Sequence, residues 1–195
     1  MTSPETGFKL LVDALDKLRV PFLVGGSLAS SIHGIVRATV DIDLVADLPP
    51  SQVEPLVKEL GAEFYADVAM IRESLKTGRA FNLIHYASSY KFDIFPLSPD
   101  PYYQQQFQRR RLEETVQFGR ELKLPIATPE DTILTKLAWY RTGGEVSERQ
   151  WHDVRGVIEV QKGRLDLAYL RKWAAHLRVE ELLERIFGEC EQRLR

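Results

Sequence analysis

Residues 25–44 read GGSLASSIHGIVRATVDIDL, and the end of this stretch decides the fold. Residues two apart on a strand point to the same face, so Asp41 and Asp43 would be neighbours there, while Ile42 and Leu44 face the core. Two carboxylates this close repel each other, and the pKa of one should rise unless a cation lies between them. Carboxylate oxygens on a rigid strand suit Mg²⁺, which typically takes one or two of them plus substrate phosphates. The pattern predicts a strand that carries a divalent-cation site.

The beginning of the same stretch predicts a site for phosphate. The apolar run at residues 22–24 favours a short buried strand, which Gly25 and Gly26 end in a tight turn. Glycine lets the backbone approach a ligand closely, and the helix expected over residues 28–33 offers free N–H groups and a positive dipole end at its start. Ser27 can cap that helix or donate to a phosphate oxygen. We therefore expect the glycine turn and the acidic pair, separated by 13 residues, to bind one metal–nucleoside triphosphate.

A third carboxylate is expected on another strand. Residues 90–95 read YKFDIF, which places Phe92 and Ile94 on one face and Lys91 and Asp93 on the other. An acid in such an apolar run is awkward unless it faces a site, and a third carboxylate would complete a two-metal site. The alternative is an aspartate near the strand end that is exposed to water. Lys91 likewise fits either the site or a solvated strand position.

These motifs resemble those of the polymerase-β-type nucleotidyltransferase superfamily, in which Gly-Ser or Gly-Gly precedes two acids separated by an apolar residue. Two further pairs look like those of minimal bacterial nucleotidyltransferases: His33-Gly34 and Arg37-x-Thr39. The AbiEii-type group, which includes toxins of toxin–antitoxin and abortive-infection systems, is the most similar. The resemblance is specific over residues 22–45 and moderate at Lys91-x-Asp93. It is looser at three later positions: Lys136, Arg149 and Asp153.

The resemblance implies a chemistry and a set of roles. Asp41, Asp43 and Asp93 would be the catalytic acids and would hold two Mg²⁺, with Mn²⁺ as an alternative. Asp93 would also take the proton of the acceptor hydroxyl. The residues that would bind the nucleotide are Gly25, Gly26, Ser27, Arg37, Lys91 and Lys136.

The implied reaction moves a nucleoside monophosphate from a nucleoside triphosphate, such as ATP, to an acceptor hydroxyl. The acceptor would be RNA (a tRNA 3′ end, for example), a protein side chain or a small molecule such as an aminoglycoside. A toxin role with a cognate antitoxin protein as partner would fit the resemblance. Two other hypotheses stay open: a catalytically silent nucleotide-binding or interaction module with the same fold, and a structural protein whose acids only decorate its surface.

Ordinary structural interpretations exist for several of these residues. Lys136 follows a helix cap and fits a surface lysine, and Arg37 could pair with Asp41 or Asp43. His33 fits a structural histidine near the turn better than a ligand.

The same holds for the element that contains Arg149. Asp153 could pair with Arg149 one helical turn away and do nothing more. The resemblance assigns no role to Arg149.

Composition and periodicity fit a globular α/β protein. The chain has 195 residues, 44% hydrophobic and 28% charged, with a net charge of −2, which are ordinary values. Its single cysteine, Cys190, excludes an intrachain disulfide and a cysteine-rich zinc site, and it fits the reducing cytoplasm. We expect neither a signal peptide nor a membrane span.

The expected fold class is α/β (α+β), with two parts. Residues 1–100 would form the nucleotidyltransferase core, for which the resemblance implies a small mixed β-sheet flanked by helices. Residues 101–195 would form a mostly helical C-terminal module packed on that core, with helices starting at caps on Thr128 and Ser147.

Overall fold

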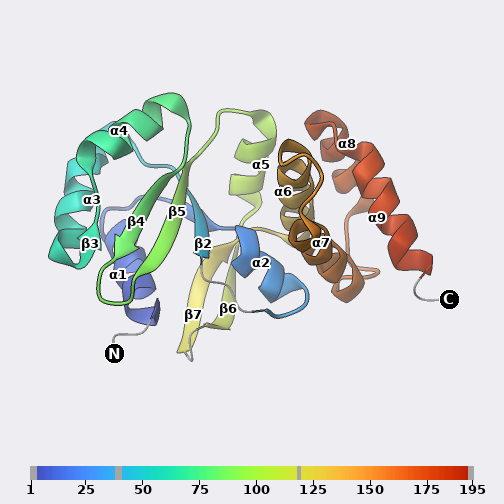
Figure 1. Ribbon diagram of the computed structural model, residues 1–195, viewed down its shortest axis with the longest axis horizontal. Helices are drawn as coiled ribbons and strands as arrows, with labels where there is room; N and C mark the ends of the chain where they lie inside the picture. Colours follow the sequence, from blue (N-terminus) through green and yellow to red (C-terminus); the bar gives the residue numbers. More distant parts are fainter. Residues whose placement is uncertain (1–3, 38–40, 118–119, 193–195) are drawn as a thin grey trace. The chain divides into compact units, whose positions relative to one another are not determined.

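The computed structural model describes most of the chain. The described residues are 4–37, 41–117 and 120–192. They divide into two compact units. The first unit takes its described residues from 4–24 and 41–126, and the second from 25–37 and 127–192. Figure 1 follows the chain through its elements by colour.

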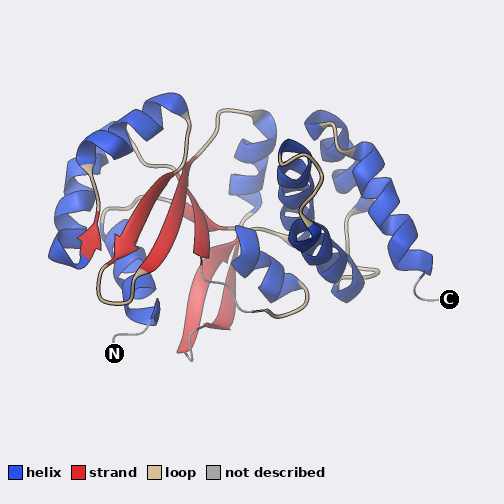
Figure 2. Ribbon diagram, viewed as in Figure 1, coloured by secondary structure: helices blue, strands red, loops and turns tan. Residues whose placement is uncertain are grey.

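One mixed β-sheet organises the first unit, and Figure 2 draws its strands in red. The strand order is β3-β4-β5-β2-β1-β7-β6. β2 pairs with β5, and β1 with β7, in parallel, whereas the other neighbours are antiparallel. The strands are β1 (Phe22–Val24), β2 (Asp41–Ala46), β3 (Phe64–Tyr65), β4 (Phe81–His85), β5 (Tyr90–Pro96), β6 (Arg111–Gln117) and β7 (Arg120–Ile126).

Helices accompany this sheet, and their ends follow local sequence signals. They are α1 (Pro4–Lys17), α3 (Val53–Leu60), α4 (Val68–Thr77) and α5 (Pro101–Arg109), with short 3₁₀ turns η1 (Pro50–Gln52) and η2 (Gly61–Glu63). The Asp67 carboxylate accepts a hydrogen bond from the Met70 amide at 2.6 Å and so begins α4, which ends at left-handed Gly78. The predicted α/β class, with a mixed sheet flanked by helices, is confirmed.

Aromatic packing on one face of the sheet fixes which side chains point the other way. Phe92 of β5 is fully buried, and its ring lies 6.1 Å from that of Phe8 on α1, 6.0 Å from Phe64 and 5.7 Å from Tyr90. Because side chains alternate along a strand, the odd-numbered residues of β5 lie on the face opposite α1.

The second unit consists of helices. They are α2 (Gly26–His33), α6 (Pro129–Thr142), α7 (Glu148–Val160), α8 (Leu167–Leu177) and α9 (Glu180–Gln192). The Thr128 hydroxyl accepts a hydrogen bond from the Asp131 amide at 3.2 Å, and Ser147 does the same for Gln150 at 3.4 Å, so both predicted caps are confirmed. In the described part of the chain, no helix is both long and apolar enough to cross a membrane.

The expected division near residue 100 differs from these two units. The module expected over residues 101–195 was predicted to be mostly helical, but β6 and β7 within it pair with each other and extend the sheet of the first unit. Leu124 and Ile126 are buried, whereas Lys123 is exposed and Pro125 is only half-buried, which is the two-residue period of a strand. The second unit also includes residues 25–37, far from its helices in sequence.

A close helix contact joins that early segment to the rest of the second unit. A Cβ added at Gly34 would lie 2.8 Å from the backbone nitrogen of Val157 and 2.9 Å from the carbonyl carbon of Gly156. Backbone atoms cannot move aside as a flexible side chain does. Gly34 is therefore required by the approach of the end of α2 to α7.

We predict opposite effects of the same substitution at two glycines of this unit. Gly34→Ala should lower the free energy of unfolding by about 1–3 kcal/mol through overpacking. Gly188→Ala, within α9, should raise it by roughly 0.5–1 kcal/mol, because nothing described lies within 4 Å of the added Cβ and alanine favours a helix. Urea unfolding of both variants measures the two changes, and a stable Gly34→Ala protein would contradict the close contact.

Candidate active site

Strand pairing in the first unit places the three predicted acids at adjacent positions on one face of the sheet. β2 and β5 run parallel in a register that sets Asp41 opposite Lys91 and Asp43 opposite Asp93. Ile42 is fully buried on the other face, so these four polar side chains share the face that α1 does not cover. The Asp93 side chain is 18% exposed and that of Asp41 37% exposed, which leaves both in contact with solvent.

Lys91 lies among these carboxylates. Its ammonium nitrogen is 2.9 Å from an Asp93 oxygen and 4.0 Å from an Asp41 oxygen. The hydrogen bond to Asp93 raises the pKa of Lys91 above its ordinary 10.5, and the charges of Asp93, Asp41 and Asp43 raise it too, although partial burial opposes the shift. Three carboxylates therefore act on one cation. Lys91 is ion-paired, not merely solvated, and its predicted contact with nucleotide stays a prediction.

The chemistry of this donor set fits a divalent cation. Three carboxylates and one ammonium leave a net charge of −2 on a partly open face, and hard oxygen donors are what Mg²⁺ and Mn²⁺ take. Within residues 4–37, 41–117 and 120–192, however, no group of three or more His, Cys, Asp or Glu side chains is arranged to hold a metal ion. A metal ion would compete with Lys91 for the oxygens of Asp93.

The second unit opens on the two predicted glycines, but α2 begins at Gly26, two residues before the helix expected over residues 28–33, so Ser27 lies within the helix and does not cap it. β1 ends at Val24, Gly25 precedes α2, and the Ala29 amide donates to the Gly25 carbonyl at 3.1 Å. Gly26 has a φ of 54°, a left-handed conformation that favours glycine. No described atom lies within 4 Å of a Cβ placed on Gly25, so a ligand has open access to this backbone.

A buried carboxylate organises the polar residues of the second unit. Both oxygens of Asp153 on α7 accept hydrogen bonds from Arg37, each at 2.8 Å, and one also accepts from the Lys136 ammonium at 2.8 Å. The side chains of Lys136 and Asp153 are only 2% and 4% exposed. The interpretation of Lys136 as a surface lysine is wrong, because Asp153 compensates its charge inside the fold.

Ser27 joins this arrangement through its hydroxyl. The Ser27 oxygen accepts hydrogen bonds from Arg37 at 2.6 Å and from Arg149 at 3.3 Å. The residues that meet here, the Asp153 cluster, are Ser27, Arg37, Lys136, Arg149 and Asp153. Their three cations and one carboxylate leave a charge of +2, which favours an anionic ligand.

The pKa of Asp153 reports the balance of forces within the cluster. Burial alone would raise it, but hydrogen bonds from Arg37 and Lys136, together with their charges, lower it below the ordinary 3.8. Asp153 is thus a carboxylate at neutral pH and keeps both cations in place. Its expected pairing with Arg149 is wrong, since Arg37 and Lys136 are its partners.

Two polar contacts complete the comparison with the sequence. His33 is buried, and its Nε2 lies 2.6 Å from the Ala127 carbonyl oxygen, so its interpretation as a structural histidine is confirmed. Sequence reasoning missed Gln150, whose side-chain oxygen accepts a hydrogen bond from Lys136 at 3.0 Å. Its place in the predicted capping box was the only signal, and that signal concerns the backbone.

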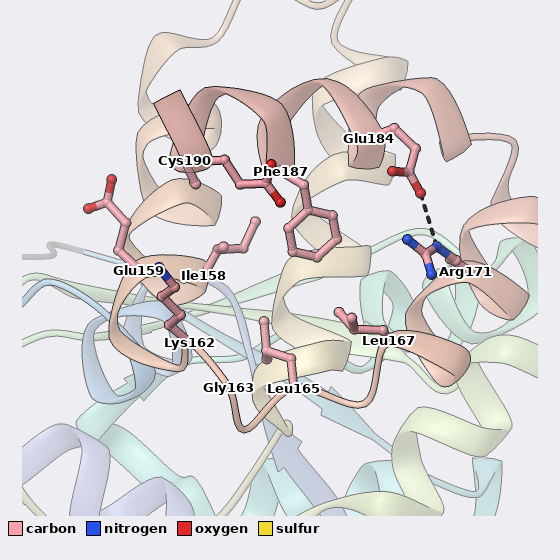
Figure 3. A pocket seen from close by; sticks show the side chains of 11 residues that line it. Ile158, Glu159, Lys162, Gly163, Leu165, Leu167, Arg171, Glu184, Phe187 and Cys190 are labelled. Carbon is pink, nitrogen blue, oxygen red and sulfur yellow. Dashed lines mark hydrogen bonds and ion pairs between the residues drawn. The ribbon is translucent and has the colours of Figure 1, made fainter. Parts of the chain in front are cut away.

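A separate hollow of about 360 Å³ lies in the second unit, between the end of α7, the start of α8 and α9 (Figure 3). At its edge Arg171 and Glu184 form an ion pair at 3.1 Å. Its apolar lining residues are Ile158, Leu165, Leu167, Phe187 and Cys190. Its charged lining residues are Glu159, Lys162, Arg171, Glu184 and Glu191, so acids outnumber bases there and this hollow differs in chemistry from the Asp153 cluster.

Known structures share the architecture, while sequence comparisons find nothing similar. A crystal structure of ANT(2'')-Ia in complex with adenylyl-2''-tobramycin matches with a TM-score of 0.52, over 89% of this chain and 95% of that one, at 16% identity. A lincomycin-bound crystal structure of the lincosamide antibiotic adenylyltransferase LnuA matches with a TM-score of 0.50, over 82% and 99%, at 15% identity. The fold is that of a nucleotidyltransferase. No protein-family model and no curated protein matches the sequence.

The nucleotidyltransferase fold confirms the sequence resemblance at the level of architecture. The AbiEii-type subgroup stays a prediction. So does the expectation that the glycine turn and the acids bind one substrate, because they belong to different units.

We predict that Asp153→Asn destabilises the protein by about 3–5 kcal/mol, because the buried Lys136 then loses its counter-charge. The matched control is Asp13→Asn, which breaks the exposed pair between Lys9 and Asp13 and should change stability little. Urea unfolding at neutral pH compares the two variants. Equal stabilities would show that the buried pair does not hold the cluster.

The lowered pKa of Asp153 predicts how this difference depends on pH. A carboxyl whose pKa is depressed in the folded state stabilises the fold above its ordinary pKa of 3.8, and the contribution is lost as the pH falls through the lower folded value. The gap in unfolding free energy between the wild type and Asp153→Asn should therefore be full at about pH 7 and shrink below about pH 4. Urea unfolding across this range tests the sign, and a gap that grows on acidification would contradict it.

Proposed function

We propose that this chain is a divalent-cation-dependent nucleotidyltransferase that moves a nucleoside monophosphate from a nucleoside triphosphate to an acceptor hydroxyl. The observation that carries the proposal is the parallel register of β2 and β5, which brings three carboxylates to one face around one cation. The nucleotidyltransferase fold supports it independently.

In this proposal the first unit binds the metal ions and accepts the proton of the acceptor hydroxyl. Asp41, Asp43 and Asp93 would hold two Mg²⁺ or Mn²⁺ ions. Such metal ions neutralise phosphate charge and lower the pKa of a bound hydroxyl. An Asp93 oxygen would accept the proton of the acceptor hydroxyl, while Lys91 keeps that carboxylate oriented through its hydrogen bond.

In this proposal the second unit binds the triphosphate. Ser27, Arg37 and Lys136 would compensate phosphate charge, and the open backbone at Gly25 would let a phosphate approach. The acceptor oxygen forms a bond to the α-phosphorus, the bond from this phosphorus to the bridging oxygen breaks, and pyrophosphate leaves. Positioning and charge neutralisation account for catalysis of this kind, and no covalent enzyme intermediate is required.

The acceptor is proposed by class only. Adenylyltransferases with this fold act on or hold antibiotics, so a small-molecule hydroxyl is one acceptor class. RNA such as tRNA and protein hydroxyls are the others. A toxin role with an antitoxin partner rests on the sequence resemblance alone.

A silent nucleotide-binding module is the second candidate, favoured by one observation. Lys91 already compensates Asp93, which is what an acidic face without a metal needs. Such a module would bind Mg–ATP but transfer nothing.

We predict that Asp43→Asn lowers transfer from an α-labelled nucleoside triphosphate by at least about 100-fold, because one carboxylate of the proposed metal site is lost. Each of the four labelled triphosphates is tested against total RNA, total protein, tobramycin and lincomycin. The control is Asp47→Asn, an equal charge change at the exposed residue that follows β2, which should transfer normally.

Far-UV circular dichroism and a melting curve establish that both variants fold. Undiminished transfer by Asp43→Asn would refute the assignment. Calorimetry of the wild type with Mg–ATP separates the second candidate, because tight binding without transfer to any acceptor favours the silent module.

A further inference from the structure

Arg149 is the one cation of the Asp153 cluster that no acid compensates. It lies in the first turn of α7 and its side chain is exposed. Among the described residues, its only hydrogen bond or ion pair is the 3.3 Å bond that it donates to the Ser27 hydroxyl. Arg37, in contrast, is held by both oxygens of Asp153.

The approach of two guanidinium groups to one small hydroxyl is unfavourable by itself. Arg37 donates to the Ser27 oxygen at 2.6 Å, so Arg149 points its charge toward another cation. Like charges this close raise the free energy of the arrangement, and Asp153, the anion beside them in the described part of the chain, pairs with Arg37 and Lys136 rather than with Arg149. Exposed Arg149 could turn into solvent, yet it extends to a serine that is only 4% exposed.

We propose that Arg149 binds the polyphosphate group of the nucleoside triphosphate, together with Ser27 and Arg37. The inference rests on the proposed function, and it assigns a role to a residue for which the sequence resemblance gives none. Arginine presents a planar fork of N–H donors that matches phosphate oxygens, and Ser27 adds a hydroxyl. The surplus of +2 in the cluster matches a ligand that carries several negative charges in a short length.

The two buried residues of the cluster do not touch the ligand in this proposal, but they position a residue that does. Lys136 and Asp153 are almost fully enclosed, and Asp153 fixes Arg37 through two hydrogen bonds. Asp153 is thus a positioning residue, because it fixes the orientation of the Arg37 guanidinium. Arg149 is exposed and pairs with no acid among the described residues, so its guanidinium is available to bind a ligand.

Inorganic tripolyphosphate, without divalent cation or acceptor, is the probe that isolates this contact. Calorimetry should show that the wild type binds it and that Arg149→Gln weakens binding by about 10- to 100-fold, the loss expected for a charge-assisted hydrogen bond. Arg149→Lys keeps the charge and should lose less. The matched control is Arg155→Gln, the same charge change further along α7, which should bind as the wild type does.

Kinetics then separate this inference from the proposed function. In the transfer assay, Arg149→Gln should raise KM for the triphosphate more than it lowers kcat, since the contact is to the phosphates rather than to the acceptor. Binding of tripolyphosphate that depends on Arg149, in a protein that transfers nothing, would refute the proposed function and leave this inference standing.

Three results would overturn the inference. The first is a wild type that does not bind tripolyphosphate, and the second is an Arg149→Gln protein that binds it unchanged. The third is a variant that loses single-stranded RNA binding but keeps its affinity for tripolyphosphate, which would make Arg149 a nucleic-acid contact. Melting curves establish that each variant folds, and Arg149→Lys provides the comparison if glutamine is not tolerated.

Discussion

The parallel pairing of β2 with β5 is the constraint on which the rest of the structure depends. Its register sets Asp43 opposite Asp93 on one face and buries Ile42 and Phe92 on the other. A shift of one residue would turn the carboxylates into the aromatic core and the apolar side chains into solvent. The cost of burying an uncompensated charge therefore protects the register, and the packing of Phe92 protects the position of the acids.

The second unit solves the opposite electrostatic problem. Cations gather there, and one carboxylate compensates the charges of the buried Lys136 and the partly exposed Arg37. Asp153 loses its hydration on burial, and Arg37 and Lys136 more than compensate, as its lowered pKa shows. The same carboxylate is not enough for a third cation. The acidic face of the first unit therefore favours a cation, and the basic cluster of the second unit favours an anion.

Short sequence patterns predicted the features that depend only on neighbouring residues. The two-residue period placed Asp41, Asp43 and Asp93 on their strands, and the glycine pair predicted the turn before α2. The burial of Lys136 could not be predicted, because it depends on Asp153 from another helix and on Arg37 from a distant segment. The β6–β7 pair escaped detection because charged residues dominate its sequence, and the apolar period is visible only near its end.

The segment between β1 and β2 connects the sheet of the first unit with the polar cluster of the second. Val24, the last residue of β1, lies opposite Leu44 of β2, so the sheet fixes where the chain leaves the first unit and where it returns. Between these points the chain contributes Ser27 and Arg37 to the second unit. A shorter connection between β1 and β2 would lose less conformational entropy on closing the strand pair. The longer one is retained at an entropic cost, and the close fit of Gly34 against α7 gives that segment a packing energy of its own. The contacts of Ser27 and Arg37 and the fit of Gly34 thus give this segment its own place in the second unit.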